Sequence, residues 1–489
     1  MSLHIESTED ALAELKKQRT KTLTAAISVS FLGVALMGLL LYLVHIIVAV
    51  PEDPPMVAYA TQEGDNPDID TPEVTQTTQR PSSSSTSAQV KVIAAVATAD
   101  VAVVNPDIEV DVPSEELSMG IDIGDGFGTG TGDGDGGGIP GIISKRCDLN
   151  DRMKRITENG GTPQCEEAVV KSLRWLKTQQ NGNGSWGEGQ FRASMTGISL
   201  LAYLAHCETP LSEEFGENVL KGISFLVDLG MKNPVLSEQP ALKEICYDHA
   251  VATYALCEAY TFCKQMYIPS ISNLEKVVVK AVDKIVDNQN TDGGWAYNYN
   301  TKAGAHTDLS VTGWNVQALK AAEHGGIKPT KGEIRSTLRK ASSYVRKNVM
   351  PDGKFSYKEN GNMPRSSLVG VGVLSLQMTG NGSDSAARKG LDWIKNNIKA
   401  LQWGQGSGTE NVKSNLYMHY YCVQAAMNRG GDVWTSYNKA FRDAVLSGQN
   451  ADGSFRKNDV GFVSGMRGKS ENIYRQCLAT LMLETYYRF

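Results

Sequence analysis

The chain has 489 residues and a formal net charge of −6 at pH 7, with 41% hydrophobic and 21% charged residues. A chain of this length and apolar content can bury a large core, which excludes a wholly disordered protein. No nucleic-acid-binding motif is present, so nucleic acid is not an expected partner.

The first fifty residues predict a membrane anchor. Residues 1–23 form a polar tail with four basic side chains, and residues 24–50 then run for 27 positions without a charge. Such a segment is long enough to cross a bilayer as one helix, whereas the core of a cleaved signal peptide is shorter. Basic residues before it and the acidic Glu52 and Asp53 after it predict a cytoplasmic N-terminus. We therefore expect a single transmembrane helix, with the rest of the chain outside the cytoplasm.

Residues 51–141 predict a disordered acidic tether. This segment is rich in Pro, Ser and Gly and holds 2 basic and 17 acidic residues. Its few large apolar side chains cannot offset the entropy lost on folding. The Gly/Asp run at 122–135 lacks the regular spacing of calcium-binding repeats, so we interpret it as a linker.

Residues 142–489 carry a helical repeat. The pattern is a helix, a polar turn with Gly, and an aromatic anchor, as in Q-N-T-D-G-G-W; it recurs at Trp186, Trp295, Phe355, Trp403 and Phe455. A degenerate copy at 222–230 brings the total to six units of about fifty residues. Helical pairs that cannot bury their apolar faces alone stack on their neighbours and can close into a ring. The repeats therefore predict an all-α fold, an α/α toroid of six helical hairpins.

These turns resemble the QW repeats of squalene–hopene cyclases and of protein prenyltransferase β-subunits. The segments 248–260, 308–314, 417–426 and 477–489 are more closely similar to membrane-anchored bacterial prenyltransferase/squalene-oxidase repeat proteins. The resemblance covers 165–489. It implies the toroid fold and a place at the bacterial inner membrane, with the toroid in the periplasm.

The candidate site lies where the inner helices of such a ring begin. Their N-termini gather at one mouth of the central cavity, and the exposed N–H groups and helix dipoles there favour an anion. The net positive charge of residues 142–489, with 42 basic and 33 acidic side chains, favours the same.

Polar residues that open these helices form the candidate site. We predict four catalytic residues, which are Asp248, His249, Asp308 and His419. We predict seven ligand-binding residues, which are Arg192, His306, Arg365, Tyr417, Tyr420, Tyr421 and Arg475.

Each of these residues also has a structural interpretation. Asp248 and Asp308 are good N-caps, buried histidines are usually satisfied by hydrogen bonds, and tyrosines at helical spacing are usually packing residues. We interpret the tryptophan anchors Trp186, Trp295 and Trp403 as structural outright.

The catalytic motifs of the resembling families are missing. Residues 142–489 contain neither the Asp-x-Asp-Asp of the cyclases nor the zinc-binding Asp-x-Cys of the prenyltransferases. The nearest approach to a metal site is Cys246, Asp248 and His249 meeting His419 and Cys422 across the cavity. We expect no metal and no other cofactor.

The eight cysteines all lie after the predicted membrane span. Cys147 and Cys165 flank the start of the toroid and are candidates for a disulfide bond. Cys257 and Cys477 lie in apolar helical patterns and are expected to be small buried side chains.

An intact repeat framework without catalytic motifs favours a binding or scaffold module. Its ligand would be an apolar or amphiphilic, isoprenoid-like lipid, or a peptide of a protein partner in the envelope. Whether the protein is an enzyme stays open: the alternatives are a divergent terpenoid cyclase or prenyltransferase-like enzyme and, less favoured, an acidic-polysaccharide lyase or hydrolase. A cyclase should show a deep apolar cavity with an acid, a polysaccharide enzyme an open basic groove, and a scaffold a filled or shallow centre.

Overall fold

The computed structural model describes residues 146–488 except 241–243, 269, 303, 359–362, 405–411, 459 and 461–465. The predicted tail at 1–23, membrane span at 24–50 and tether at 51–141 lie outside the described residues. No helix within the described ranges is long and apolar enough to cross a membrane. The fold below is therefore that of the predicted toroid.

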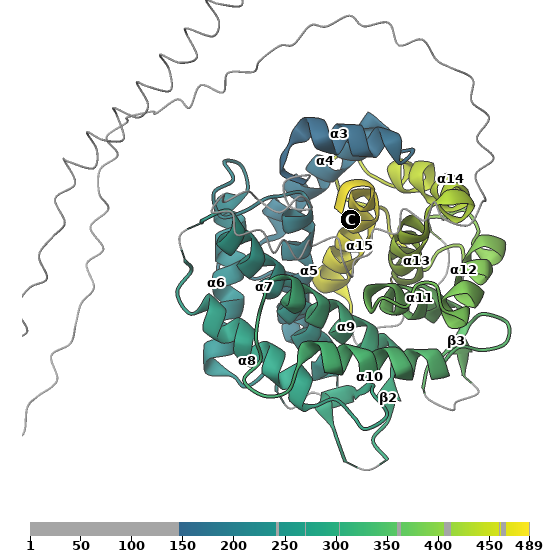
Figure 1. The fold of residues 1–489 in the computed structure, drawn as a ribbon. Coiled ribbons are helices and arrows are strands. Elements are labelled where there is room, and N and C mark those ends of the chain that lie inside the picture. Colours follow the sequence, from purple (N-terminus) through teal and green to yellow (C-terminus); the bar gives the residue numbers. More distant parts are fainter. Residues whose placement is uncertain are drawn as a thin grey trace, which may run out of the picture. The chain divides into compact units, whose positions relative to one another are not determined.

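Thirteen α-helices supply most of the regular structure in the described ranges. The chain enters through α3 (Leu149–Glu158) and then alternates between an outer and an inner layer (Figure 1). The outer helices are α4 (Pro163–Gln179), α6 (Gly216–Lys232), α8 (Leu274–Asp287), α10 (Ile334–Lys347), α12 (Ser385–Asn397) and α14 (Gly431–Ser447). The inner helices are α5 (Arg192–Ala205), α7 (Ile245–Gln265), α9 (Leu309–His324), α11 (Val369–Met378), α13 (Leu416–Arg429) and α15 (Gly468–Arg488).

The inner helices close a ring. Each of them packs against the next, from α5 to α15, and α15 packs back against α5. Each outer helix packs against the inner helix that follows it in the chain, so that the six hairpins run from α4/α5 to α14/α15. The described residues thus form the α/α toroid that the repeats predict.

Burial follows from the two layers. Outer helix α8 buries one stripe, with Leu274, Val277, Val278, Ala281, Val282 and Ile285 as its buried residues. Inner helix α5 is buried on all sides, from Ala193 to Ala205 without a break. A helix with one apolar stripe faces the core from outside, whereas an all-round apolar helix must lie inside it.

Short irregular elements join the layers above the inner helices. Strand β1 (Trp295–Ala296) pairs antiparallel with β2 (Thr307–Asp308), and β3 (Phe355–Ser356) pairs antiparallel with β4 (Pro364–Arg365). The 3-10 turns are η1 (Gly189–Phe191), η2 (Tyr297–Tyr299) and η3 (Ser366–Leu368). These two hairpins place residues directly before α9 and α11 at the mouth of the ring.

Three of the repeated turns hold their hairpin to the next outer helix through a glutamine side chain. The Gln289 Nε2 donates to the Gly293 carbonyl at 2.9 Å and to the Thr337 carbonyl of α10 at 2.8 Å. Gln180 and Gln449 make the equivalent pairs of bonds to Gly184 and Asn218, and to Gly453 and Ala168. These three turns share one geometry, which explains why the motif repeats in the sequence.

The aromatic anchors are structural, as predicted. Trp186 and Trp295 are fully buried and their indole N–H groups donate to the Leu176 and Ile285 carbonyls, both at 2.8 Å. Trp403 donates to the Ala444 carbonyl at 2.6 Å and stacks on Phe455. Each indole thus ties the turn to the end of an outer helix.

Cys147 and Cys165, the candidate pair for a disulfide, are not bonded to each other. Cys147 is bonded to Cys207, which follows α5, with a Cα–Cα distance of 5.0 Å. Cys165 lies in the first turn of α4, where it is buried and accepts the Thr162 N–H in a capping box. Cys257 and Cys477 are free and buried, as predicted.

Candidate functional site

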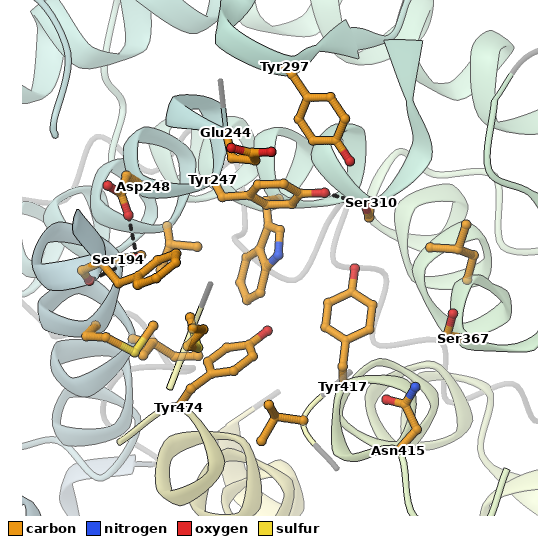
Figure 2. Close-up of a pocket in the computed structure, with 18 of the residues that line it drawn as sticks. Ser194, Glu244, Tyr247, Asp248, Tyr297, Ser310, Ser367, Asn415, Tyr417 and Tyr474 are labelled. Atoms are coloured by element: carbon orange, nitrogen blue, oxygen red, sulfur yellow. Dashed lines mark hydrogen bonds between the residues drawn. The ribbon is translucent and has the colours of Figure 1, made fainter. Parts of the chain in front are cut away.

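A cavity of about 400 Å³ lies at the mouth of the ring where the inner helices begin (Figure 2). Each inner helix, or the residues just before it, contributes a polar group to the wall. These are Ser194 (α5), Asp248 (α7), Ser310 (α9), Ser367 (η3), Asn415 (before α13) and Tyr474 (α15). The helix starts therefore converge on one cavity.

The wall of this cavity is mainly aromatic and apolar. Its aromatic members are Phe191, Tyr247, Tyr297, Trp314, Tyr357, Tyr417 and Tyr474. Figure 2 shows Tyr417 and Tyr474 projecting towards the centre from the side opposite Tyr247 and Tyr297. Aliphatic and methionine side chains such as Ile198, Val251, Leu368 and Met466 fill the remaining wall. Such a surface suits a hydrophobic ligand with few polar groups.

Asp248 is a buried acid in the cavity wall. It lies in the first turn of α7 but does not cap the helix, because the N-cap is Glu244. Its carboxylate oxygens accept the Ser194 hydroxyl at 2.5 Å and the Ser237 hydroxyl at 3.0 Å. Burial, only partly offset by these hydrogen bonds, raises the pKa of Asp248 to about 7. This carboxyl group can therefore both hold and release a proton near neutral pH.

Asp308 is the N-cap of α9, which is the structural role that the sequence allowed for it. Its Oδ1 accepts the Ser310 N–H and hydroxyl, both at 2.6 Å, and the Val311 N–H at 3.3 Å. The side chain is fully buried behind the cavity wall. Asp308 thus holds Ser310 in place at the cavity and touches the cavity only through its neighbours.

Three tyrosine hydroxyls gather near Asp308. Tyr247 is hydrogen-bonded to the Ser310 hydroxyl at 2.6 Å, and the Tyr297 and Tyr357 hydroxyls are bonded to each other. Burial, and then the charge of Asp308, raise the pKa values of Tyr247, Tyr297 and Tyr357. These tyrosines therefore keep their protons at neutral pH.

The structure does not bring His249 and His419 to the cavity. His249 Nδ1 accepts the Leu236 N–H at 2.9 Å and its Nε2 donates to the Ala281 carbonyl of α8 at 3.0 Å. His419 Nδ1 is bonded to the Tyr437 hydroxyl of α14 at 2.7 Å. Burial lowers the pKa of both histidines to about 4, so both rings are neutral. Each ring is hydrogen-bonded to an outer helix, so both histidines have the structural role that the sequence allowed for them.

Two of the seven predicted ligand-binding residues, Arg365 and Tyr417, line the cavity. Tyr420 and Tyr421 lie deeper in the core, where the Tyr420 hydroxyl donates to Gln317 at 3.4 Å and the Tyr421 hydroxyl accepts from Gln317 at 2.9 Å. Both rings also pack on Trp314. These two tyrosines support the cavity floor and do not form its surface.

The other three predicted ligand-binding residues lie outside the lining. Arg192 is paired with Glu238 at 2.6 Å. Arg475 is buried and paired with Asn472 and Glu471 on its own helix. His306 is exposed, and its ring packs against those of Tyr297 and Tyr357.

Several lining residues went unrecognised in the sequence. Tyr297 and Tyr357 follow the anchors Trp295 and Phe355 by two residues in neighbouring repeats, which is a signal that the spacing offered. Glu244 and Tyr247 precede the motif that drew attention to Asp248 and carry no signal of their own.

The structure does not bring together the residues that came nearest to a metal site in the sequence, which are Cys246, Asp248, His249, His419 and Cys422. In the described part of the chain, no group of three or more His, Cys, Asp or Glu side chains is placed to hold a metal ion. His249 and His419 bond to opposite outer helices, so they do not meet across the cavity.

No protein-family model matches the chain, and comparison with curated proteins gives no match. Among solved structures, it is similar to the GH76A α-1,6-mannanase of Salegentibacter sp. HEL1_6, with 12% identity, 66% of this chain and 98% of that chain covered, and a TM-score of 0.48. It is also similar to the type II terpene cyclase MstE from Scytonema in complex with geranylgeranyl dihydroxybenzoate, with 12% identity, 69% and 99% covered, and a TM-score of 0.42. A protein from Actinoplanes gives 12% identity, 66% and 99% covered, and a TM-score of 0.43. Likeness at this level assigns no activity to the chain.

Proposed function

We propose that the toroid binds an apolar or amphiphilic ligand of isoprenoid type in the cavity at the helix mouth. The observation that carries this proposal is the aromatic and apolar wall around a space of about 400 Å³. Pockets for small ligands typically measure about 300 to 1,000 Å³ and are lined in this way. A scaffold with a filled centre would have no such space.

The test is calorimetric titration of the full-length chain with geraniol, a short and soluble isoprenoid alcohol. We expect saturable binding, weakened about tenfold or more by Trp314→Ala, because this change removes a large apolar contact from the wall. The control is Trp175→Ala on the outer helix α4, outside the lining, which should bind as the unmodified chain does. An absence of binding, or equal losses in both variants, would refute the proposal.

A divergent enzyme of the terpenoid cyclase or prenyltransferase type is the second candidate, and Asp248 is the observation that favours it. A carboxyl with a pKa of about 7 in an apolar wall is suited to general acid–base work at neutral pH. It is a weak acid, so it suits protonation of a departing oxygen better than protonation of an alkene.

The corresponding test is ionisation of geraniol, in which the acid protonates the hydroxyl oxygen and the C–O bond breaks to release water. The allylic cation then loses a proton to the carboxylate to give a hydrocarbon, or takes up water again and loses a proton to give a rearranged alcohol. If the protein is such an enzyme, the full-length chain should convert geraniol into hydrocarbons or alcohols that are rearranged or cyclised. The Asp248→Asn variant should form none of these products. Unchanged geraniol, or equal conversion by the variant, would rule out this role and leave the binding function in place.

An acidic-polysaccharide enzyme finds less support in the cavity. The described lining residues include one arginine, Arg365, and no lysine, together with the acids Glu244 and Asp248. The described lining is therefore not that of a basic groove.

The membrane anchor at 24–50, the periplasmic place of the toroid and membership of the bacterial prenyltransferase/squalene-oxidase repeat group remain part of this proposal. The uncharged stretch of 27 residues supports the anchor. We expect the full-length chain in the membrane fraction after carbonate washing and a chain without 24–50 in the soluble fraction. Equal distribution of the two chains would refute the anchor.

A further inference from the structure

The hydrogen bonds at one end of the cavity have a fixed direction. The Ser310 hydroxyl donates its only proton to Asp308 at 2.6 Å. Its oxygen can therefore only accept in its bond with the Tyr247 hydroxyl at 2.6 Å, so Tyr247 is the donor. The chain of donors runs from Tyr247 through Ser310 to Asp308. What Tyr247 can still offer a ligand is its oxygen lone pairs and the face of its ring.

The Tyr297 and Tyr357 hydroxyls lie near the same carboxylate. They are bonded to each other, and the charge of Asp308 adds to burial in raising the pKa of both. We call Tyr247, Tyr297, Ser310, Asp308 and Tyr357 the acceptor cluster, because Asp308 accepts the Ser310 proton and Ser310 in turn accepts that of Tyr247.

Carboxylates extend this acceptor character along the wall. Glu244 lies one helical turn from Tyr247 and beside it in Figure 2. Asp248 also lies in the wall, where its two oxygens accept from Ser194 and Ser237. Arg365 is the one basic side chain among the described lining residues, and it has interactions with neighbours of its own. Among the described lining residues there are thus two acidic side chains and one basic one.

The expected preference for an anion is not supported at the two best-defined helix starts. Asp308 takes the first N–H groups of α9, and the Asn415 side chain accepts the Met418 N–H of α13 at 3.0 Å. A capped N–H group is not available to an anionic ligand, and the cap of α9 is itself a carboxylate.

Aromatic faces complete a site for a cation. The Tyr247 and Tyr297 rings lie 5.8 Å apart between centroids, with 50° between their planes. An organic ammonium group is attracted by such ring faces and can donate hydrogen bonds to oxygen acceptors. It can make both interactions in a cavity that is otherwise apolar.

We propose that the cavity selects ligands with a protonated amine on an apolar chain, with the ammonium group held by the acceptor cluster and Glu244. This rests on the proposed function, since the apolar wall takes the chain of the ligand and the acceptor cluster takes its head.

The test compares three ligands with the same chain and different heads. Geranylamine, geraniol and geranyl phosphate are titrated into the full-length chain by calorimetry at neutral pH. We expect the amine to bind about tenfold tighter than the alcohol, and the phosphate to bind more weakly than both. Equal binding of amine and alcohol, or tighter binding of the phosphate, overturns the ammonium proposal and leaves the proposed function intact. No binding of any of the three overturns the proposed function itself.

Two variants assign the preference to named groups. Glu244→Gln should weaken geranylamine binding about fivefold to tenfold and leave geraniol unchanged, because only the charge is removed. Tyr247→Leu should also weaken the amine more than the alcohol, because the ring face is lost. The matched controls are Glu217→Gln and Tyr267→Leu, which change exposed side chains elsewhere. Equal losses for amine and alcohol in both cavity variants would show that these residues only shape the cavity, which overturns the proposal.

Discussion

Asp248 and His249 are neighbours in α7 whose pKa values are moved in opposite directions by the same cause. Burial disfavours a charge, so it raises the pKa of the acid to about 7 and lowers that of the imidazole to about 4. The acid faces the cavity, whereas the ring bonds to backbone groups of Leu236 and Ala281. One residue of helical rotation, about 100°, separates a wall group from a core group.

The raised pKa of Asp248 predicts a pH dependence of stability. Below about pH 4 the folded and unfolded states both hold the proton; between about pH 4 and pH 7 only the unfolded state ionises. The stability associated with this group is therefore present at low pH and lost as pH rises through about 7. Asp248→Asn should gain stability relative to the unmodified chain over this window, on the order of 3 to 4 kcal/mol.

Urea unfolding of both chains at about pH 4.5 and about pH 7.5 measures this difference. His249, whose lowered pKa acts in the opposite sense, is common to both chains and cancels in the comparison. A difference in stability that stays constant with pH would contradict the assignment.

At the scale of elements, the repeated turn explains both the sequence motif and the packing. Gly293 has φ 98°, and a Cβ there would lie 2.2 Å from the Lys340 carbonyl of α10. Gly184, Gly353 and Gly453 meet the carbonyls of Lys221, Lys389 and Lys171 in the same way. Glycine therefore lets each of these turns approach the next outer helix, and in three of them the amide of Gln180, Gln289 or Gln449 then bonds to it.

Gly293→Ala should lower the free energy of unfolding by about 3 kcal/mol or more, because strain at positive φ adds to a backbone clash. The control is Gly304→Ala, where φ is 76° but no atom lies within 4 Å of the added Cβ. This control should cost only about 1 kcal/mol. Chemical denaturation of the two variants measures the contrast, and equal losses would show that the approach to α10 is unimportant.

At the scale of the whole molecule, the ring depends on contacts between distant parts of the chain. The last helix, α15, packs against α5 and α4. The Arg146 guanidinium bonds to the Arg488 carbonyl at 3.2 Å and to Glu258 at 3.4 Å. The Cys147–Cys207 disulfide holds the entry of the toroid to the end of α5. Closure is thus reinforced where the first and last described elements meet.

Removal of the disulfide should destabilise the toroid by about 2 to 4 kcal/mol, because the bond closes a loop with a sequence separation of 60 residues. Thermal or urea unfolding of a Cys147→Ser, Cys207→Ser double variant measures this. The unmodified chain under reducing conditions is the control and should match the variant. A variant as stable as the oxidised chain would contradict the prediction.

The sequence by itself was enough to predict the toroid, because the residues that form each turn are close together in the chain. In the turn at 289–295, for example, the Gln, Gly and Trp lie within a few residues of one another, and their steric and hydrogen-bonding needs recur in the other turns. It also located the mouth where Asp248, Arg365 and Tyr417 meet, since helix starts are visible in a repeat.

Only the tertiary structure decided which polar groups face the cavity and which cysteines pair. The rotation of each helix about its axis depends on packing against both neighbours, which turns His249 and His419 outward and Tyr247 inward. The partner of Cys147 is set by how the start of the toroid lies against the end of α5, where Arg152 also bonds to the His206 carbonyl. Such choices are made by contacts between residues far apart in the chain, for which local spacing carries no information.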